Sequence, residues 1–128
     1  MTSLISLRSK GMPCAIASSS FEPDIVVIFE KAGHSTPPCT VVGRRSGLRP
    51  KPEADIFVYA AGVLGFEPAD CLVIEDAHKG LDAAKAVGMR CAVLKNEYNR
   101  DLKYPGADAV IESHAAFAEA VRKWRSDR

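Results

Sequence analysis

The chain has 128 residues, of which 47% are hydrophobic and 26% charged, with a formal net charge of +1. This length and apolar content suit one domain around one core, so residues 1–128 are treated as a single domain. Charges that nearly cancel exclude the positive field of a dedicated nucleic-acid or anionic-membrane binder, and no apolar run approaches the roughly 20 residues of a membrane helix.

The sequence pattern in the first third of the chain predicts the end of a helix, then a strand, then a second helix. Residues 4–11 resemble the last turns of a helix that is closed by a glycine. Residues 13–17 form a short apolar run before three serines, which suits a buried strand that opens into a polar loop. Residues 23–33 place apolar side chains at helical spacing between a proline and a glycine, and they predict a helix.

The same alternation continues to the C-terminus. Apolar strands that alternate with amphipathic helices require parallel strands joined by helical crossovers. We therefore expect a doubly wound, Rossmann-like α/β fold with a mostly parallel sheet and helices on both faces. The further expected strands are 39–42, 71–74, 90–94 and 108–111, and the further expected helices are 54–64, 81–88 and one from an N-cap at Ser113 through Trp124.

Polar residues at strand ends are the candidate site, because ligands of open α/β sheets gather beyond the carboxyl ends of the strands. Three places stand out in the sequence: Ser18-Ser19-Ser20, Lys51-Pro52 and Glu75-Asp76. A hydroxyl and backbone N–H groups can bind phosphate oxygens, a lysine can neutralise phosphate charge, and paired carboxylates can hold a hard cation such as Mg²⁺. Each feature alone is common in surface loops and helix caps, so only the ordered combination is informative.

Longer stretches around these residues resemble the beta-phosphoglucomutase-like branch of the haloacid-dehalogenase-like (HAD) hydrolases. The stretches are 15–20, 51–57, 71–80 and 83–89, in the order and at the spacing of the family. By this resemblance Ser18 binds the transferring phosphoryl group beside the Ser19 N–H, and Lys51 stabilises its charge. Asp76 becomes a ligand of Mg²⁺, and Glu75 orients metal-bound water. Positioning and charge neutralisation are what phosphoryl transfer demands.

Family members also begin with a strand that ends in Asp-x-Asp, whose first aspartate attacks phosphorus, followed by a helical cap. No aspartate of this sequence follows another by two residues at the end of an apolar strand. The resemblance therefore implies an incomplete HAD core that lacks its central first strand and its cap. That strand would lie between the strand before Ser18 and the strand before Glu75, so two strand edges would be unpaired. A fragment, a truncated gene model and a degenerate paralogue all fit this pattern.

The segment before Lys51 departs from the family pattern. Family members carry an acidic stretch and a glycine there, whereas residues 43–50 read Gly-Arg-Arg-Ser-Gly-Leu-Arg-Pro, so that with Lys51 the loop holds four basic residues. Ala54 also replaces a proline that the family has after the lysine. The basic loop could gather a phosphorylated substrate or could simply be solvated, and the sequence leaves both interpretations open.

Two functional hypotheses follow. One is a Mg²⁺-dependent phosphatase or phosphomutase that acts on a small phosphorylated metabolite of the sugar-phosphate type, inactive as this chain alone. The other is a non-catalytic remnant that binds phosphate or a partner chain. A flavodoxin-like or receiver-type domain fits less well, because its acidic cluster belongs near the chain start. Self-association through the exposed sheet edge is a further expectation.

The cysteines and histidines carry no site in this interpretation. The four cysteines are far apart, and Cys14, Cys71 and Cys91 lie in apolar runs, as expected for reduced core thiols of a cytoplasmic protein. No secretory-type apolar block occurs at the N-terminus. His34, His78 and His114 lack partners at metal-ligand spacing, so surface or capping roles are expected for them.

Overall fold

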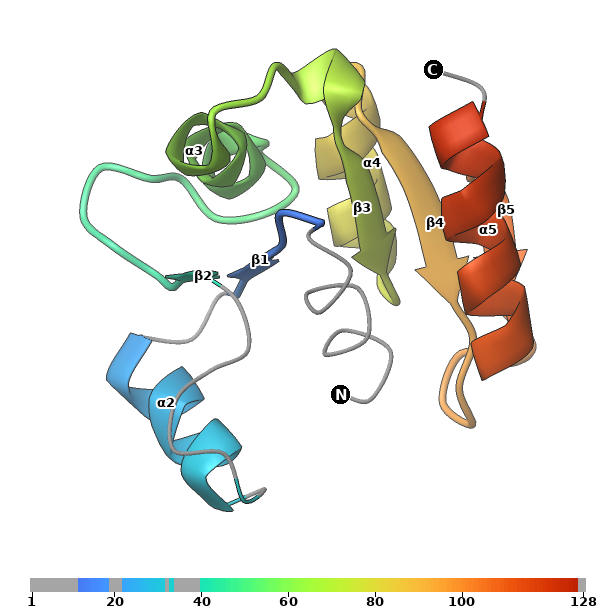
Figure 1. The fold of residues 1–128 in the computed structure, drawn as a ribbon, viewed down its shortest axis with the longest axis horizontal. Coiled ribbons are helices and arrows are strands. Elements are labelled where there is room, and N and C mark those ends of the chain that lie inside the picture. The colour runs from blue at the N-terminus through green and yellow to red at the C-terminus, as the bar shows by residue number, and fades with distance from the viewer. Residues whose placement is uncertain (1–11, 19–21, 32, 34–39, 127–128) are drawn as a thin grey trace.

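The computed structural model describes residues 12–18, 22–31, 33 and 40–126 (Figure 1). The helix end expected at residues 4–11, the serines at 19 and 20, and His34 lie outside these residues. Within them, no helix is both long enough and apolar enough to cross a membrane.

Strands and helices alternate along the chain as the sequence predicts, with bounds that differ by a few residues. A short 3-10 helix, η1, precedes β3. The elements are β1 (Ala15–Ala17), α2 (Glu22–Lys31), β2 (Thr40–Val42), α3 (Asp55–Leu64), η1 (Pro68–Asp70), β3 (Leu72–Glu75), α4 (His78–Ala86), β4 (Arg90–Leu94), β5 (Ala109–Ile111) and α5 (His114–Ser126).

All strand pairs of the described residues are parallel, which confirms the predicted fold class. The strands form two sheets, one with the order β1-β2 and one with the order β3-β4-β5. Strands β1 and β3, which the family resemblance places on either side of a further strand, are both edge strands. The division into two sheets therefore agrees with a core whose central strand is not among the described residues.

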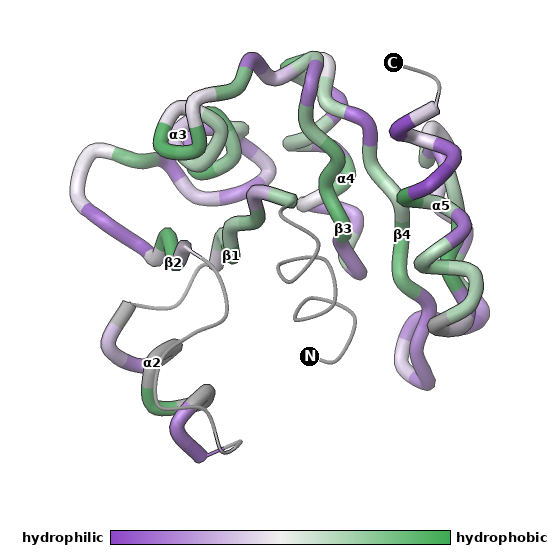
Figure 2. The backbone as a smooth tube through the Cα atoms, in the orientation of Figure 1, coloured by the Kyte–Doolittle hydropathy of each residue, from purple (hydrophilic) through white to green (hydrophobic). Residues whose placement is uncertain are grey.

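Helices cover both faces of the three-stranded sheet. In Figure 1, α4 lies behind β3 and β4, and α5 lies in front of β5; both helices contact the sheet. Helix α3 packs instead on β1, in the other half of the molecule. Figure 2 shows the apolar residues concentrated on the strands and on α3, with polar residues on the connecting loops.

One core cluster extends from Val42 and α3 across α4 to β4. Three consecutive residues of β4, Cys91, Ala92 and Val93, are at most 1% exposed. Burial raises the pKa of the Cys91 thiol to about 12, so this cysteine stays a protonated core side chain at neutral pH. Cys14 is buried as well, whereas Cys71 is only partly buried, so the predicted core position is confirmed for Cys14 and Cys91.

Polar contacts fasten the ends of these elements. The Ser113 hydroxyl accepts a 3.1 Å hydrogen bond from the Ala116 N–H, which confirms the predicted N-cap of α5. Asp108, just before β5, accepts hydrogen bonds from the Lys85 ammonium at 2.8 Å and from the Cys91 N–H at 2.7 Å. This carboxylate thus joins α4, β4 and β5.

Candidate functional site

The four described residues that the sequence singles out meet in one cavity of about 430 Å³. The cavity lies beyond the carboxyl ends of β1 and β3, where the open-sheet rule places ligands. Its lining residues are Ala17, Ser18, Lys51, Ile74, Glu75, Asp76 and Leu94. The structure therefore brings together side chains up to 58 positions apart, from Ser18 to Asp76.

Lys51 and Glu75 form a partly buried ion pair at this cavity. The Lys51 Nζ lies 2.9 Å from the Glu75 Oε2, and the two side chains are only 16% and 13% exposed. The same ammonium lies 4.9 Å from the centroid of the Phe57 ring, within range of a cation–π contact. The Glu75 carboxylate therefore neutralises the Lys51 ammonium and fixes its position at the cavity.

Gly80 makes room for the Glu75 side chain. A Cβ atom built on Gly80, in the first turns of α4, would lie 2.0 Å from the Glu75 Cδ and 2.1 Å from its Oε2. Carbon and oxygen atoms cannot approach so closely, so any other residue at position 80 would push the carboxylate aside. The glycine thus allows Glu75 to lie over the helix and reach Lys51.

The backbone of Asp76 is held by a loop that follows β4. The Asp76 carbonyl accepts hydrogen bonds from the Asn99 side-chain amide at 3.0 Å and from the Tyr104 hydroxyl at 2.9 Å. Asn99 is 5% exposed and also donates to the Leu94 carbonyl at 3.1 Å. With its carbonyl fixed, Asp76 keeps an exposed carboxylate, whose Oδ2 accepts a hydrogen bond from the Asn96 side-chain amide at 3.4 Å.

Aromatic contacts support the same loop from outside. The His78 ring stacks on the Tyr104 ring with centroids 4.2 Å apart, and the Lys95 Nζ lies 4.9 Å from that ring's centroid. The His78 Nε2 lies 2.8 Å from the Lys103 carbonyl oxygen. His78 is exposed, as the sequence predicts, and it ties the start of α4 to the loop.

Ser18 occupies the end of β1. Its N–H donates a 3.0 Å hydrogen bond to the Val42 carbonyl, which continues the β1-β2 ladder and orients the residue at the cavity. Ser19, the predicted backbone donor, lies outside the described residues. The role of Ser18 as a phosphate ligand stays a prediction, as do the roles of Lys51, Glu75 and Asp76.

The basic loop before Lys51 is partly engaged within the chain. Arg49 contacts the Asp55 carboxylate with its guanidinium at 2.9 Å and with its backbone N–H at 2.9 Å. The hydrogen bond from Arg49 lowers the pKa of Asp55, and the same contact raises the pKa of Arg49. The Arg45 guanidinium lies 4.6 Å from the centroid of the Tyr59 ring. Arg49 is thus paired with the first residue of α3.

The described residues offer a metal ion little beyond one carboxylate. Among them, no group of three or more His, Cys, Asp and Glu side chains could hold a metal ion. A single carboxylate is compatible with Mg²⁺, because this ion is commonly bound by one or two carboxylates together with water and substrate phosphate. The exposed Asp76 carboxylate fits such a ligand, whereas the Glu75 carboxylate is paired with Lys51.

The sequence interpretation missed Gly80, Asn99 and Tyr104. A signal for the loop was available, because the strand-end rule applied to β4 selects Lys95 and Asn96, which open that loop. Gly80 closes the stretch 71–80 that carries the family resemblance, but its role was not predicted because it depends on the path of the Glu75 side chain.

The comparisons with known proteins agree with the predicted family and fold. A family model described as haloacid dehalogenase-like hydrolase matches residues 2–88. A parallel α/β fold with a polar cluster at the carboxyl ends of its strands is the class to which such hydrolases belong. The chain belongs to the haloacid dehalogenase-like hydrolase family.

Two relatives of this chain are longer than the chain itself. Protein CbbY of Rhodobacter capsulatus is 38% identical over 119 residues, which is 89% of this chain and 52% of that protein. Hexitol phosphatase A of Escherichia coli is 35% identical over 88 residues, 69% of this chain and 39% of that protein. The chain therefore spans about half or less of the length of these two relatives.

Solved structures share the fold. The crystal structure of CbbY from Rhodobacter sphaeroides in complex with phosphate matches with a TM-score of 0.78 and 28% identity, over 89% of this chain and 52% of that one. A beta-phosphoglucomutase from Clostridium difficile matches with a TM-score of 0.77 at 23% identity, over 98% of this chain and 54% of that one. The second likeness bears on the fold alone.

Proposed function

We propose that this chain carries the phosphate- and Mg²⁺-binding part of a phosphatase or phosphomutase site for a small phosphorylated metabolite. The observation that supports this most is the single cavity shared by Ser18, Lys51 and Asp76 at the carboxyl ends of two strands. A hydroxyl, a cation and a carboxylate that could hold Mg²⁺, gathered around one cavity, are groups that can position and neutralise a phosphoryl group.

The ion pair gives Lys51 a defined task. Its ammonium is fixed by Glu75 at 2.9 Å, so it is already oriented when a phosphate oxygen arrives and loses little rotamer entropy on binding. The Ser18 hydroxyl, at the end of β1, donates a hydrogen bond to the same phosphate. Mg²⁺ bound at Asp76 would neutralise further phosphate charge. The nucleophile belongs to none of these three residues and must be supplied by another segment.

The sugar-phosphate class of substrate is proposed from the relatives. Hexitol phosphatase A is named for a phosphorylated sugar alcohol, and CbbY of Rhodobacter sphaeroides was crystallised with xylulose bisphosphate. These names describe those proteins, and they make a compact phosphorylated polyol the first substrate class to test here.

A non-catalytic role is the second candidate. It concerns the 128 residues by themselves, among which no aspartate stands at the position of the family nucleophile. In that case the same three residues would bind phosphate without turnover.

Hydrolysis of a generic aryl phosphate by the purified chain, with and without Mg²⁺, separates the two candidates. Activity that beryllium fluoride inhibits and that Asp76→Asn abolishes would show catalysis through an aspartyl-phosphate. Phosphate binding without hydrolysis, lost in Lys51→Met, would show the non-catalytic role. Lys103→Met is the matched control, since that side chain is exposed and outside the cavity. Neither binding nor hydrolysis by a folded chain would contradict both candidates.

A further inference from the structure

The loop that holds Asp76 is itself built around one ammonium group, that of Lys95, which follows β4 directly. The Tyr104 ring faces this ammonium, and its centroid lies 4.9 Å from the Lys95 Nζ. The Nζ also donates to three backbone carbonyls of the same loop, those of Asn99 at 3.1 Å, Arg100 at 3.4 Å and Leu102. We call these three oxygens the carbonyl cage.

The carbonyl cage suits a lysine ammonium. This group carries three N–H donors and no acceptor, so three carbonyl oxygens can satisfy it. Hydrogen bonds from a charged donor are stronger than those between neutral groups, and the negative face of an aromatic ring adds to the attraction. Carbonyl oxygens that point to a common centre repel one another, and a positive charge between them removes this repulsion. The charge of Lys95 therefore stabilises the observed shape of the loop.

The carbonyl cage shares residues with the contacts that fix the Asp76 backbone. Asn99 accepts from Lys95 with its backbone carbonyl and donates its side-chain amide to the Asp76 carbonyl at 3.0 Å. Tyr104 faces the ammonium with its ring and donates its hydroxyl to the same Asp76 carbonyl at 2.9 Å. Both side chains are buried, so they cannot shift without rearranging the loop. The two donors to Asp76 thus depend on a loop that Lys95 stabilises.

Asn96 extends the same support to the Asp76 carboxylate. Its side-chain oxygen accepts from the backbone N–H groups of Tyr98 at 2.8 Å and Asn99 at 3.0 Å. With this oxygen bound inside the loop, the Asn96 side-chain nitrogen points the other way and donates to the Asp76 Oδ2 at 3.4 Å. The loop therefore orients both the carbonyl group and the carboxylate of Asp76.

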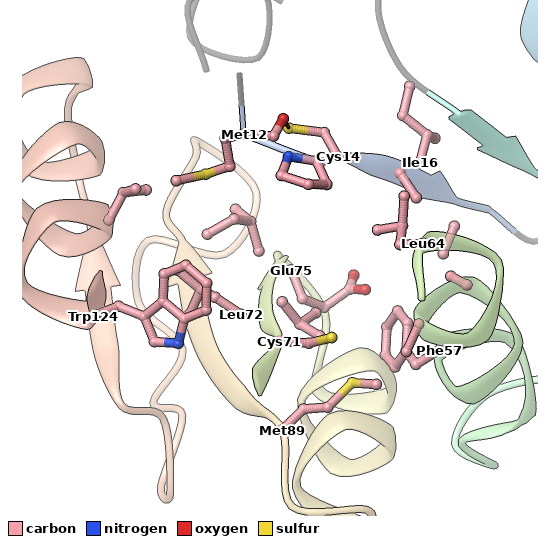
Figure 3. A pocket seen from close by; sticks show the side chains of 18 of the residues that line it. Met12, Cys14, Ile16, Phe57, Leu64, Cys71, Leu72, Glu75, Met89 and Trp124 are labelled. Atoms are coloured by element: carbon pink, nitrogen blue, oxygen red, sulfur yellow. Dashed lines mark hydrogen bonds between the residues drawn. The ribbon is translucent and has the colours of Figure 1, made fainter. Parts of the chain in front are cut away.

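The position of Asp76 matters because the other carboxylate of the cavity is engaged. Figure 3 shows the Glu75 carboxylate directed toward Phe57 of α3, and its Oε2 accepts a 2.9 Å hydrogen bond from Lys51. Among the residues that line the cavity, Asp76 is the other acidic side chain. Mg²⁺ demands near-ideal ligand geometry, so residues that orient its ligands affect its affinity.

We propose that Lys95 is a positioning residue for the Asp76 carboxylate and acts as a fixed cation that organises the loop 95–104 through the carbonyl cage. Lys95 touches neither phosphate nor metal in this role, since it acts through the donors of its own loop. The role rests on the proposed function in one respect, that Asp76 is taken as a ligand of Mg²⁺. The organisation of the loop is a property of the metal-free chain, and it is measured without metal.

Amide hydrogen exchange of the metal-free chain tests the organisation of the loop. Lys95→Met keeps a long apolar side chain but removes the charge and the donors. The N–H groups of Asn99 and Leu102 are hydrogen-bonded within the loop, and in this variant they should exchange faster by about tenfold or more. Lys103→Met, at an exposed lysine of the same loop, is the matched control and should leave both rates unchanged.

Two outcomes of the exchange experiment would overturn the proposal. In the first, the loop amides of Lys95→Met exchange as slowly as those of the wild-type chain. In the second, the buried β4 residue Val93 gains exchange by the same factor, which would show a general loss of stability rather than a local one.

Chemical rescue separates the charge of Lys95 from the packing of its side chain. Lys95→Ala removes the ammonium together with its stem. Propylammonium chloride, a primary ammonium with N–H donors, should restore slow exchange at the Leu102 N–H in this variant. Tetramethylammonium chloride at the same concentration has the same charge without N–H donors and should not restore it. Equal restoration by both salts, or by neither, would contradict a cation site at the carbonyl cage.

A Mg²⁺ titration followed by the Asp76 amide NMR signal tests the link to the proposed function. Lys95→Met should weaken Mg²⁺ binding by about tenfold or more, and Lys103→Met should not. Equal Mg²⁺ affinity of the wild-type chain and Lys95→Met would overturn the positioning role. If Asp76 of the wild-type chain does not respond to Mg²⁺, the proposed function fails at this residue, and the exchange rates of the metal-free chain still decide whether Lys95 organises the loop.

The competing role for Lys95 is direct binding of phosphate, because the preceding residue, Leu94, lines the phosphate cavity. A titration with inorganic phosphate separates the two roles. Under the proposal, Lys95→Met changes the exchange of the loop amides in the absence of phosphate. Loss of phosphate binding in a Lys95→Met chain whose loop amides still exchange slowly would make Lys95 a phosphate ligand and would overturn the proposal.

Discussion

The two sheets differ in how completely they are packed. In the β3-β4-β5 sheet, the central strand is enclosed by a neighbour on each side and by helices on both faces, and its three middle residues are at most 1% exposed. In the β1-β2 sheet, Val42 is 1% exposed, whereas all three residues of β1 are only half-buried. The most completely buried strand thus lies in the C-terminal sheet, and the site lies where the two sheets meet.

The largest expected effect comes from truncating the same residue type in each sheet. Ile111 of β5 is 0% exposed, so Ile111→Ala should lower the free energy of unfolding by about 2 to 5 kcal/mol. Ile16→Ala in the half-buried β1 should cost less than about half of that, because less surface is buried there. Urea denaturation of both variants measures the difference. Equal losses would mean that the two sheets are equally well packed.

The next effect concerns two helical glycines. Gly80→Ala should displace the Glu75 carboxylate and separate it from Lys51, with a net destabilisation of about 1 to 3 kcal/mol. Gly62→Ala in α3 meets nothing within 4 Å and should stabilise the chain by up to about 1 kcal/mol, the ordinary gain of alanine in a helix. Thermal unfolding of the two variants should shift in opposite directions. A stabilised Gly80→Ala variant would show that Glu75 adapts without cost.

A smaller effect is expected from the loop that holds Asp76. Tyr104→Phe keeps the ring beside His78 but loses the hydrogen bond to the Asp76 carbonyl, which should cost about 0.5 to 1.5 kcal/mol. Tyr98→Phe is the control, because that side chain is 87% exposed and should change stability by less than about 0.5 kcal/mol. Amide exchange at Asp76 and Ala77 should rise in the first variant alone. Unchanged exchange would contradict a role for Tyr104 in fixing this turn.

The smallest effect is a pH dependence within the C-terminal sheet. Burial opposes ionisation of Asp108, but the hydrogen bonds from Lys85 and the Cys91 N–H outweigh it and lower the pKa of this carboxyl. A lowered pKa in the folded state means stability that is present above the unfolded value of about 3.9 and is lost as the pH falls through the folded value. Asp108→Asn should therefore reduce the loss of stability between neutral pH and about pH 3, measured by urea denaturation. Asp82→Asn, at an exposed position, is the control. The same reduction in that variant would contradict the assignment of this pH dependence to Asp108.

Local sequence patterns predicted the elements well because each strand is a short apolar run bounded by residues that end it. The N-cap at Ser113 and the glycine that closes α3 at Gly65, with φ of 84°, are local signals of this kind. The strand-end rule also selected Ser18, Lys51, Glu75 and Asp76, which the structure gathers in one cavity.

Contacts between distant segments were beyond the sequence. The Lys51–Glu75 ion pair joins residues 24 positions apart, and the Tyr104 hydrogen bond to Asp76 spans 28 positions. Neither spacing has a periodic signature, because both depend on how α4 and the loop after β4 fold over the sheet edge. The division into two sheets was foreseen only through the family resemblance, which placed a further strand between β1 and β3.

The central claim is that the carboxyl ends of β1 and β3 form one phosphate site, and titration of the labelled chain with inorganic phosphate tests it most directly. The amide NMR signals of Ser18, Lys51 and Asp76 should shift together along one binding curve, and Lys51→Met should weaken that curve at least tenfold while Lys103→Met leaves it unchanged. Shifts that follow separate curves, or that gather around Arg44 and Arg45 instead, would contradict a shared site.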